Sequence, residues 1–229
     1  MDEMTTSIKG SEHWTSKDGG AKLFLFEKCA GEPAKSIGTI LFVHGSSMAS
    51  QPTFDLQVPG RPDSSVMDHF ARRGYDCWCV DMEGYGRSTK NRDNNAPISQ
   101  GADDCYAAAL YIRRLRGKRP LLVYGISSGA LRAGMFAERH PEMVARLALD
   151  AMVWTGEGSP TLAERRKKLP EFQAKNRRPI DKSSSIRSST ATIPAARRKK
   201  WSTSSPTQSV LLTIQCRRAL TSTCARSCP

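Results

Sequence analysis

The sequence predicts an α/β protein whose doubly wound, mostly parallel sheet is incomplete at the C-terminal strands. Short apolar runs alternate with helical patterns from residue 20 to residue 150. Such alternation is typical of parallel strands joined by helices that cover both faces of the sheet. From residue 183 onward the alternation stops. The strands that would complete the sheet are therefore missing from the pattern.

The strands are predicted from short runs of apolar, β-branched and aromatic residues. Asp18-Gly19-Gly20 is a turn signal between two short strand-like runs, and the second run spans residues 22–27. Four later runs are continuously apolar, which is typical of strands that are buried on both faces. They cover residues 39–43, 77–80, 120–124 and 145–149.

Helical spacing of apolar residues separates these strands. It covers residues 66–73, 101–115 and 128–139, and a charged helical pattern follows at 161–174. Gly74 and Gly117 follow the first two segments, as expected of residues that end helices. The third segment begins directly after a strand, which predicts a strand-to-helix turn.

Polar or small residues follow each of the four buried strands. They are His44-Gly45, Asp81, Ser127 and Asp150. In open parallel sheets the reactive groups gather at the carboxyl ends of the strands. We therefore expect these positions to lie at one edge of the sheet and to form the functional site.

The turn after the strand at 120–124 contains a G-x-S-x-G pentapeptide, Gly125-Ile126-Ser127-Ser128-Gly129. Between a buried strand and a helix, such a motif places the serine on a strained turn that exposes its hydroxyl above the sheet. The turn also leaves the backbone N–H of Ser128 at a helix N-terminus, where it can stabilise a tetrahedral oxyanion. A Gly-Ser turn without chemistry is the alternative. The context favours a nucleophilic serine.

Over residues 20–155 the chain resembles the α/β-hydrolase family. Residues 41–47, Leu-Phe-Val-His-Gly-Ser-Ser, are similar to that family's oxyanion loop. Residues 81–88, Asp-Met-Glu-Gly-Tyr-Gly-Arg-Ser, are similar to its D-x-x-G-x-G-x-S loop, and residues 125–129 to its nucleophile elbow. The three motifs occur in the family's order and at about its spacing, so together they are specific.

The resemblance implies roles for individual residues. Ser127 would be the nucleophile, and the N–H groups of Ser46 and Ser128 would form the oxyanion hole, with Ser47 as a second candidate. His44 would be a structural histidine that orients its loop. The carboxylate of Asp81 would cap its own loop by hydrogen bonds.

The general base that the serine needs is missing from the expected place. In the family the order along the chain is serine, acid, histidine, yet the last of the four histidines here is His140. It ends the helix that starts at the motif, which places it roughly 20 Å from Ser127. Asp150 is a possible acid, and otherwise caps a loop. If the chain nevertheless hydrolyses a substrate rapidly, His44 is the first histidine to test as the base.

The charge of the chain is concentrated near its C-terminal end. The formal net charge is +13, of which +8 comes from residues 183–229. That segment has no Asp, Glu or Gly, more than a third of it is Ser or Thr, and its only strand-like run is 209–214. We therefore expect two parts: a partial hydrolase domain at 1–182 that includes the start of a cap segment, and a basic tail at 183–229. The tail's composition predicts disorder. A frameshift in the gene near codon 182, which would make the tail an out-of-frame product, is another explanation of this composition.

The N-terminus, the apolar runs and the cysteines narrow the classes of protein to which the chain can belong. The N-terminus lacks the features of a signal peptide and no run of 18 apolar residues occurs, so a cytoplasmic protein with no membrane span is expected. The seven cysteines form no C-x-x-C pair, which predicts inert thiols and no metal site. No cofactor and no specific nucleic acid are expected, and the oligomeric state is left open.

These observations lead to one main interpretation of the function and one alternative. The main reading is a serine hydrolase that transfers the acyl group of a small-molecule carboxylic ester to water, with weak activity because the chain lacks a triad histidine. The alternative is a non-catalytic binding protein on the same scaffold, whose basic tail contacts nucleic acid or an acidic membrane. The cluster at residues 197–201 in that tail could also act as a nuclear localisation signal.

Overall fold

The computed structural model describes residues 8–61, 63–90, 92, 95–152 and 157–175 of the 229-residue chain. The predicted domain boundary at residue 182 and the tail at 183–229 lie outside the described residues.

Six strands form one mostly parallel sheet in the order β1-β2-β4-β3-β5-β6. Strand β3 pairs in parallel with β4 and β5, and β5 pairs in parallel with β6. Strands β1 and β2 form an antiparallel hairpin that joins the sheet beside β4. The predicted parallel arrangement is confirmed, and β6 forms one edge. The strands are β1 (Gly10–Ser16), β2 (Lys22–Lys28), β3 (Gly38–Val43), β4 (Tyr75–Val80), β5 (Leu121–Ile126) and β6 (Val144–Asp150).

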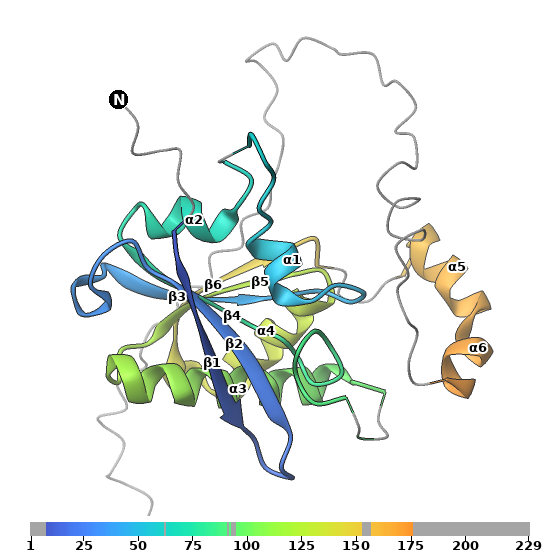
Figure 1. Ribbon diagram of the computed structural model, residues 1–229. Helices are drawn as coiled ribbons and strands as arrows, with labels where there is room; N and C mark the ends of the chain where they lie inside the picture. Colours follow the sequence, from blue (N-terminus) through green and yellow to red (C-terminus); the bar gives the residue numbers. More distant parts are fainter. Residues whose placement is uncertain (1–7, 62, 91, 93–94, 153–156, 176–229) are drawn as a thin grey trace, which may run out of the picture.

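Helices cover both faces of the sheet, as expected of a doubly wound fold (Figure 1). One face carries α1 (Ser50–Phe54) and α2 (Val66–Ala71), and the other carries α3 (Ile98–Arg116) and α4 (Ser128–Arg139). Two 3-10 turns, η1 (Pro33–Lys35) and η2 (Pro141–Met143), precede β3 and β6. None of the described helices combines the length and apolar character that crossing a bilayer requires.

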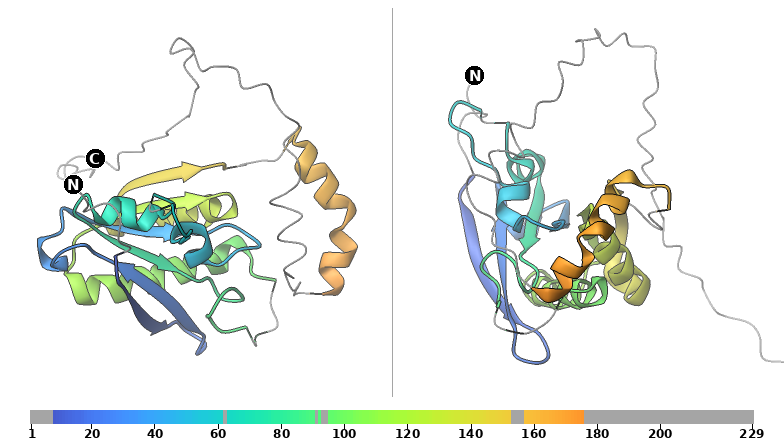
Figure 2. Two further views of the ribbon diagram at one scale, coloured as in Figure 1. Left: turned by 45° about the horizontal axis from the view of Figure 1, so that its top comes forward. Right: turned by 90° about the vertical axis from the view of Figure 1, so that its right-hand side faces the viewer.

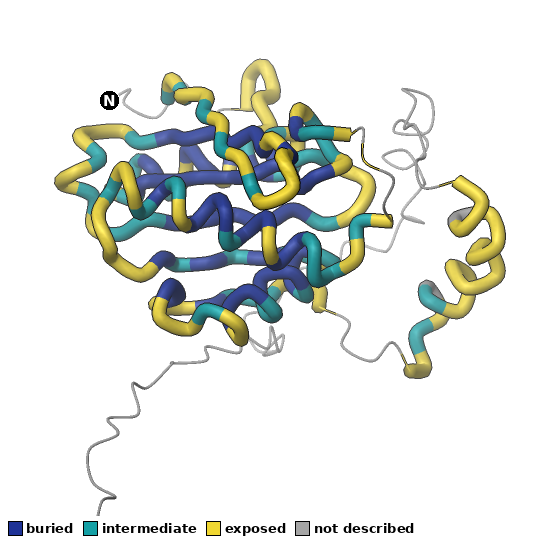
Figure 3. The backbone as a smooth tube through the Cα atoms, turned by 90° about the horizontal axis from the view of Figure 1, so that it is seen from below, coloured by how far each residue is buried: buried dark blue, intermediate teal, exposed yellow. Residues whose placement is uncertain are grey.

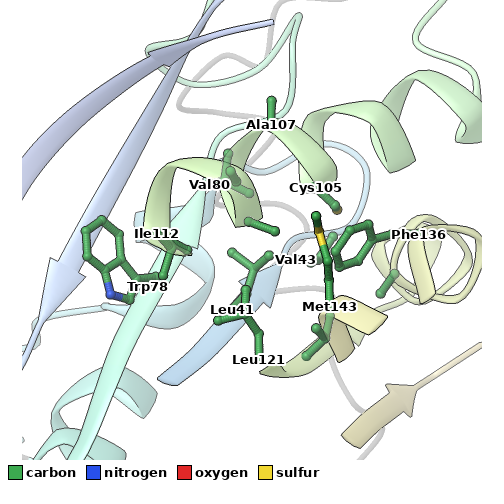
Figure 4. Packing of buried hydrophobic residues seen from close by; sticks show 14 of the residues in the cluster. Leu41, Val43, Trp78, Val80, Cys105, Ala107, Ile112, Leu121, Phe136 and Met143 are labelled. Carbon is green, nitrogen blue, oxygen red and sulfur yellow. The ribbon is translucent and has the colours of Figure 1, made fainter. Parts of the chain in front are cut away.

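The strands divide their apolar side chains between two cores, because successive residues of a strand point to opposite faces. In β3, Leu41 and Val43 belong to the core under α3 and α4, whereas Ile40 and Phe42 belong to the core under α1 and α2. Figure 4 shows the first core, where Trp78 is the largest fully buried side chain. Burial of this apolar surface is the main favourable contribution to folding.

The predicted helix at 161–174 is two helices in the structure, α5 (Pro160–Lys167) and α6 (Leu169–Ala174). The break falls at Lys168 because Pro170 has no N–H to donate and its ring would clash with the preceding turn of a continuous helix. In Figure 1 and in the left view of Figure 2 the two helices lie away from the sheet, and Figure 3 shows them mostly exposed.

Candidate active site

The backbone of Ser127 has the strained turn that the motif predicts. Ser127 lies between β5 and α4 with φ 58° and ψ −124°, a region that non-glycine residues rarely adopt. Its N–H donates a hydrogen bond of 2.9 Å to the backbone carbonyl of Asp150, which ties the turn to the end of β6. The residue is exposed, and no described residue forms a hydrogen bond with its hydroxyl. Such strain costs about 1 to 3 kcal/mol and is characteristic of functional sites.

Two glycines make this turn possible because other chain segments approach them closely. A Cβ atom on Gly129 would lie 2.3 Å from the carbonyl oxygen of Val43 and 2.5 Å from that of His44. A Cβ atom on Gly125 would lie 2.5 Å from the carbonyl oxygen of Gly129. The glycines therefore let α4 pack directly against the end of β3, which places the loop after β3 beside Ser127.

The loop after β3 and the start of α4 meet next to the serine. A Cβ atom on Gly45 would lie 3.1 Å from Cβ of Ser127, and the hydroxyls of Ser46 and Ser128 are 2.8 Å apart. As the first residue of α4, Ser128 has a backbone N–H that has no partner within the helix. The helix dipole adds positive potential at this point. Ser47, the second candidate for the oxyanion hole, is exposed and has φ 74°.

His44 is fully buried and both of its ring nitrogens have backbone partners. Nδ1 lies 2.7 Å from the carbonyl oxygen of Gly45, and Nε2 accepts a hydrogen bond of 3.1 Å from the N–H of Met82. Burial, with the nearby Arg132 guanidinium as the second cause, lowers the pKa of His44 from 6.5 to about 4. A buried imidazole with both nitrogens occupied cannot take a proton from Ser127. His44 therefore links the loops after β3 and β4.

Arg132 is a buried residue of the site for which the sequence predicted no role. It is only 2% exposed, it donates a hydrogen bond of 3.2 Å to the carbonyl oxygen of His44, and its guanidinium lies over the Tyr85 ring at 5.3 Å. No described carboxylate pairs with it. One signal was available: Arg132 falls on the same helical face as Gly129 and Phe136, which are also buried.

Asp81 caps its own loop, as the resemblance implies. One carboxylate oxygen accepts hydrogen bonds from the N–H and the hydroxyl of Ser50, and the other accepts from the N–H of Arg87 at 2.8 Å. The hydroxyl of Ser88 donates to the backbone carbonyl of Asp81 at 2.6 Å. The Asp81 carboxylate thus has three donors and organises the loop after β4.

Asp150 lies at the end of β6 and is exposed. One of its carboxylate oxygens accepts a hydrogen bond of 2.6 Å from the hydroxyl of Tyr124, a partner that the sequence reading missed. Burial, followed by this hydrogen bond, raises the pKa of Tyr124. The structure therefore brings Asp150 to the carboxyl edge of the sheet, where its backbone contacts Ser127 and its side chain contacts Tyr124.

The other three histidines are engaged elsewhere. His13 bonds to Glu27 at 2.8 Å and to the Tyr111 hydroxyl at 3.2 Å. His69 is in the last turn of α2, and His140, at the end of α4, stacks on Tyr106. Within the described part of the chain, Ser127 therefore has no imidazole partner. Over the same residues, no group of three or more His, Cys, Asp or Glu side chains could hold a metal ion.

Comparison with known proteins agrees with this geometry. The sequence model of the alpha/beta hydrolase fold matches residues 38–198, which is more than half of the chain. The chain belongs to the alpha/beta hydrolase fold family. The three motifs around Ser127 all begin within the matched range. A search of curated proteins found none that matches this alpha/beta hydrolase.

Solved structures of several hydrolases share the fold. An esterase from Pyrococcus furiosus matches with TM-score 0.53 and 17% identity over 72% of this chain and 60% of its own. A thioesterase domain from the curacin biosynthetic pathway matches with TM-score 0.53 and 18% identity, over 81% and 63%. An epoxide hydrolase from Vigna radiata matches with TM-score 0.51 and 17% identity, over 69% and 44%. At these identities the likeness concerns the fold, and this chain spans 44–63% of their lengths.

Proposed function

We propose that this alpha/beta hydrolase is a serine hydrolase that acts on carboxylic esters, with Ser127 as the nucleophile. The observation that carries the proposal is the backbone of Ser127, held at φ 58° between β5 and α4 with its side chain exposed. A strained, exposed serine at this turn is suited to attack a carbonyl carbon. A catalytic role would explain why the fold retains the strain.

The N–H groups of Ser46 and Ser128 form the oxyanion hole in this proposal. The 2.8 Å contact between their hydroxyls brings the two residues together beside Ser127. The unpaired N–H at the start of α4 and the dipole of that helix both favour negative charge at this point. Donors that are held in place before the reaction stabilise the oxyanion without further reorganisation.

The activity of this chain is limited by the lack of a base for Ser127. All four histidines of the sequence are described. His13, His44 and His140 have other contacts. His69 lies in the last turn of α2, which leads into the amino end of β4, away from the edge that carries Ser127. Asp150 is retained as the candidate acid, because it lies at the carboxyl edge beside the Ser127 backbone. Its carboxylate already accepts the Tyr124 hydroxyl, so it can hold a neighbouring group but lacks an imidazole to orient.

The helices α5 and α6 are proposed as the start of a cap segment. They follow β6, and most of their residues are exposed. In this proposal residues 1–182 form a partial hydrolase domain, and the identity of the ester depends on parts outside the described residues.

Added imidazole tests the proposal because it can supply the missing base to an exposed serine. Hydrolysis of p-nitrophenyl acetate would be measured with and without imidazole, for the chain and for Ser127→Ala. Imidazole also hydrolyses this ester by itself, so the variant at the same imidazole concentration is the matched control. We expect a larger imidazole-dependent rate for the chain than for Ser127→Ala, together with acetylation of Ser127 detected by mass spectrometry. Equal rates and an unmodified Ser127 would support the non-catalytic alternative.

A further inference from the structure

Three loops converge at the edge of the sheet that is opposite to Ser127. They lead into β4, β3 and β5, which are parallel neighbours, so their amino ends lie side by side. The N–H of Ile37, before β3, donates a hydrogen bond of 2.9 Å to the carbonyl of Gly74, before β4. On the other side of β3, Ile40 pairs with Leu122, which places the loop before β5 next to Ile37.

These loops carry four exposed basic residues around one exposed apolar side chain. Ile37 is 68% exposed, the highest value among the exposed large hydrophobic residues. We call five exposed residues of this edge the amino-edge patch: Lys35, Ile37, Arg73, Lys118 and Arg119. Its members come from three separate loops, so the fold brings the positive charges together.

Few acidic residues lie close enough to neutralise the patch. Glu32 pairs with Lys35 at 2.9 Å, but both side chains are highly exposed, so this ion pair contributes little. Glu142 precedes β6, at the side of the patch beyond β5. The guanidinium of Arg73 donates to the backbone carbonyl of His69, which leaves its charge without a carboxylate in that contact. Positive charge therefore exceeds negative charge at this edge.

We propose that the amino-edge patch binds an anionic membrane surface, with Ile37 entering the headgroup region. Lys and Arg near such a surface each contribute favourable electrostatic energy that salt screens. An aliphatic side chain surrounded by cations is suited to the boundary between headgroups and acyl chains. The patch lies at the edge opposite to Ser127, so binding leaves the proposed active site facing the solution.

The composition of the patch favours lipid over nucleic acid as the partner. Single-stranded nucleic acids are bound by basic grooves whose aromatic side chains stack on the bases. The patch has no aromatic member, and its central side chain is aliphatic. Neither the charge nor the position of the patch depends on the role proposed for Ser127.

Co-sedimentation of the full chain with vesicles tests the proposal. Vesicles of phosphatidylcholine alone would be compared with vesicles that also contain phosphatidylserine, at low and at high salt. The test variant is Arg73→Glu/Arg119→Glu. The matched control is Arg165→Glu/Arg166→Glu on α5, which changes the net charge equally at exposed sites outside the patch. We expect the test variant to weaken binding to phosphatidylserine vesicles by about 30-fold or more, and the control by much less.

Ile37→Ser tests the apolar contribution without changing the charge. We expect it to weaken vesicle binding by several-fold and to leave the circular dichroism spectrum unchanged, because the side chain is exposed. Equal losses in the two charge-reversal variants would show that net charge alone attracts the chain, and would overturn the proposal. Tighter binding of single-stranded RNA than of vesicles, lost in Arg73→Glu/Arg119→Glu, would assign the patch to nucleic acid instead.

Discussion

The backbone N–H of Met82 donates a hydrogen bond to Nε2 of His44, across a distance of 3.1 Å. A nitrogen that accepts a hydrogen bond carries no proton, so the proton of the neutral imidazole lies on Nδ1. From there it is donated to the carbonyl of Gly45 at 2.7 Å. The loop beside Ser127 and the loop after β4 therefore depend on a single tautomer of a single histidine.

The first prediction concerns the protonation of His44. Burial lowers its pKa to about 4, so we expect nitrogen NMR to show a neutral Nδ1–H tautomer throughout the range from pH 8 to pH 5. An Nε2–H tautomer, or titration near pH 6.5, would contradict the hydrogen bond from Met82.

The second prediction is a dependence of stability on pH. Because the folded pKa of His44 lies below its ordinary 6.5, the unfolded chain binds this proton first as the pH falls. The free energy of unfolding should therefore drop by about 2 to 3 kcal/mol between pH 6.5 and pH 4 from this group. Asp76 acts in the opposite direction, since burial raises its pKa from 3.8 to about 6 and its contribution is lost as the pH rises through 6.

Urea unfolding of Asp76→Asn separates the two contributions. Without the opposing carboxyl, the free energy of unfolding should fall more steeply from pH 6.5 to pH 4 than it does in the unmodified chain. An identical slope in both proteins would show that the pKa of Asp76 is not raised by folding.

The third prediction concerns the charge of Arg132. Its guanidinium is the second cause of the low pKa of His44, so Arg132→Met should raise that pKa. The value should stay below 6.5, because burial is the larger cause and remains. NMR titration of the variant would measure the shift. Arg139→Met is the matched control at the exposed end of α4, where the side chain pairs with Asp103, and it should leave the pKa of His44 unchanged.

The fourth prediction compares two glycines of α4. Gly129→Ala should lower the free energy of unfolding by about 3 kcal/mol, because the new methyl group meets backbone carbonyl oxygens that cannot move without shifting β3. Gly134→Ala should raise it by up to about 1 kcal/mol, since nothing lies within 4 Å and alanine favours the helix. Urea unfolding measures both. A Gly129→Ala variant as stable as Gly134→Ala would mean that α4 and β3 are farther apart.

The fifth prediction concerns catalysis without added imidazole. An active site that lacks its triad can retain a rate enhancement of about 10³ to 10⁴ over the reaction in water, which comes from the oxyanion hole and from substrate binding. That residual rate depends little on the serine, because an unactivated hydroxyl is a weak nucleophile. We therefore expect Ser127→Ala to change the hydrolysis of p-nitrophenyl acetate by less than about tenfold. Fast turnover that disappears in this variant would show that another group serves as the base, and His44 would be the first histidine to test.

The sequence predicted the parallel strands well because burial on both faces leaves a continuous apolar run. The run at 39–43 became β3 and the run at 145–149 became β6, each with bounds within one residue at either end. Helix α1 was missed because five residues that include Pro52 are too few to show a helical period. The break between α5 and α6 was missed although Pro170 marks it.

The candidate site was predictable where a residue's role follows from its backbone position. Ser127, Gly125 and Gly129 are recognisable from the pentapeptide, because the turn restricts which residues fit. Contacts between side chains from distant segments were not predictable. The hydrogen bond of Tyr124 to Asp150 joins two neighbouring strands, and their pairing register becomes known only from the structure.

Strand β6 ends the order of the sheet, and within the described residues one of its sides has no partner strand. A row of free backbone N–H and C=O groups on an edge strand is a template to which another chain can add. Arg146 and Asp150 are exposed on this strand, but Asp150 lies at its end, so the rest of the edge has one charge and limited protection against such pairing. Pairing of another chain with this edge would lower the colloidal stability of the purified chain, and Ala145→Lys, which places a second charge beside Arg146, is the change most suited to reduce such pairing.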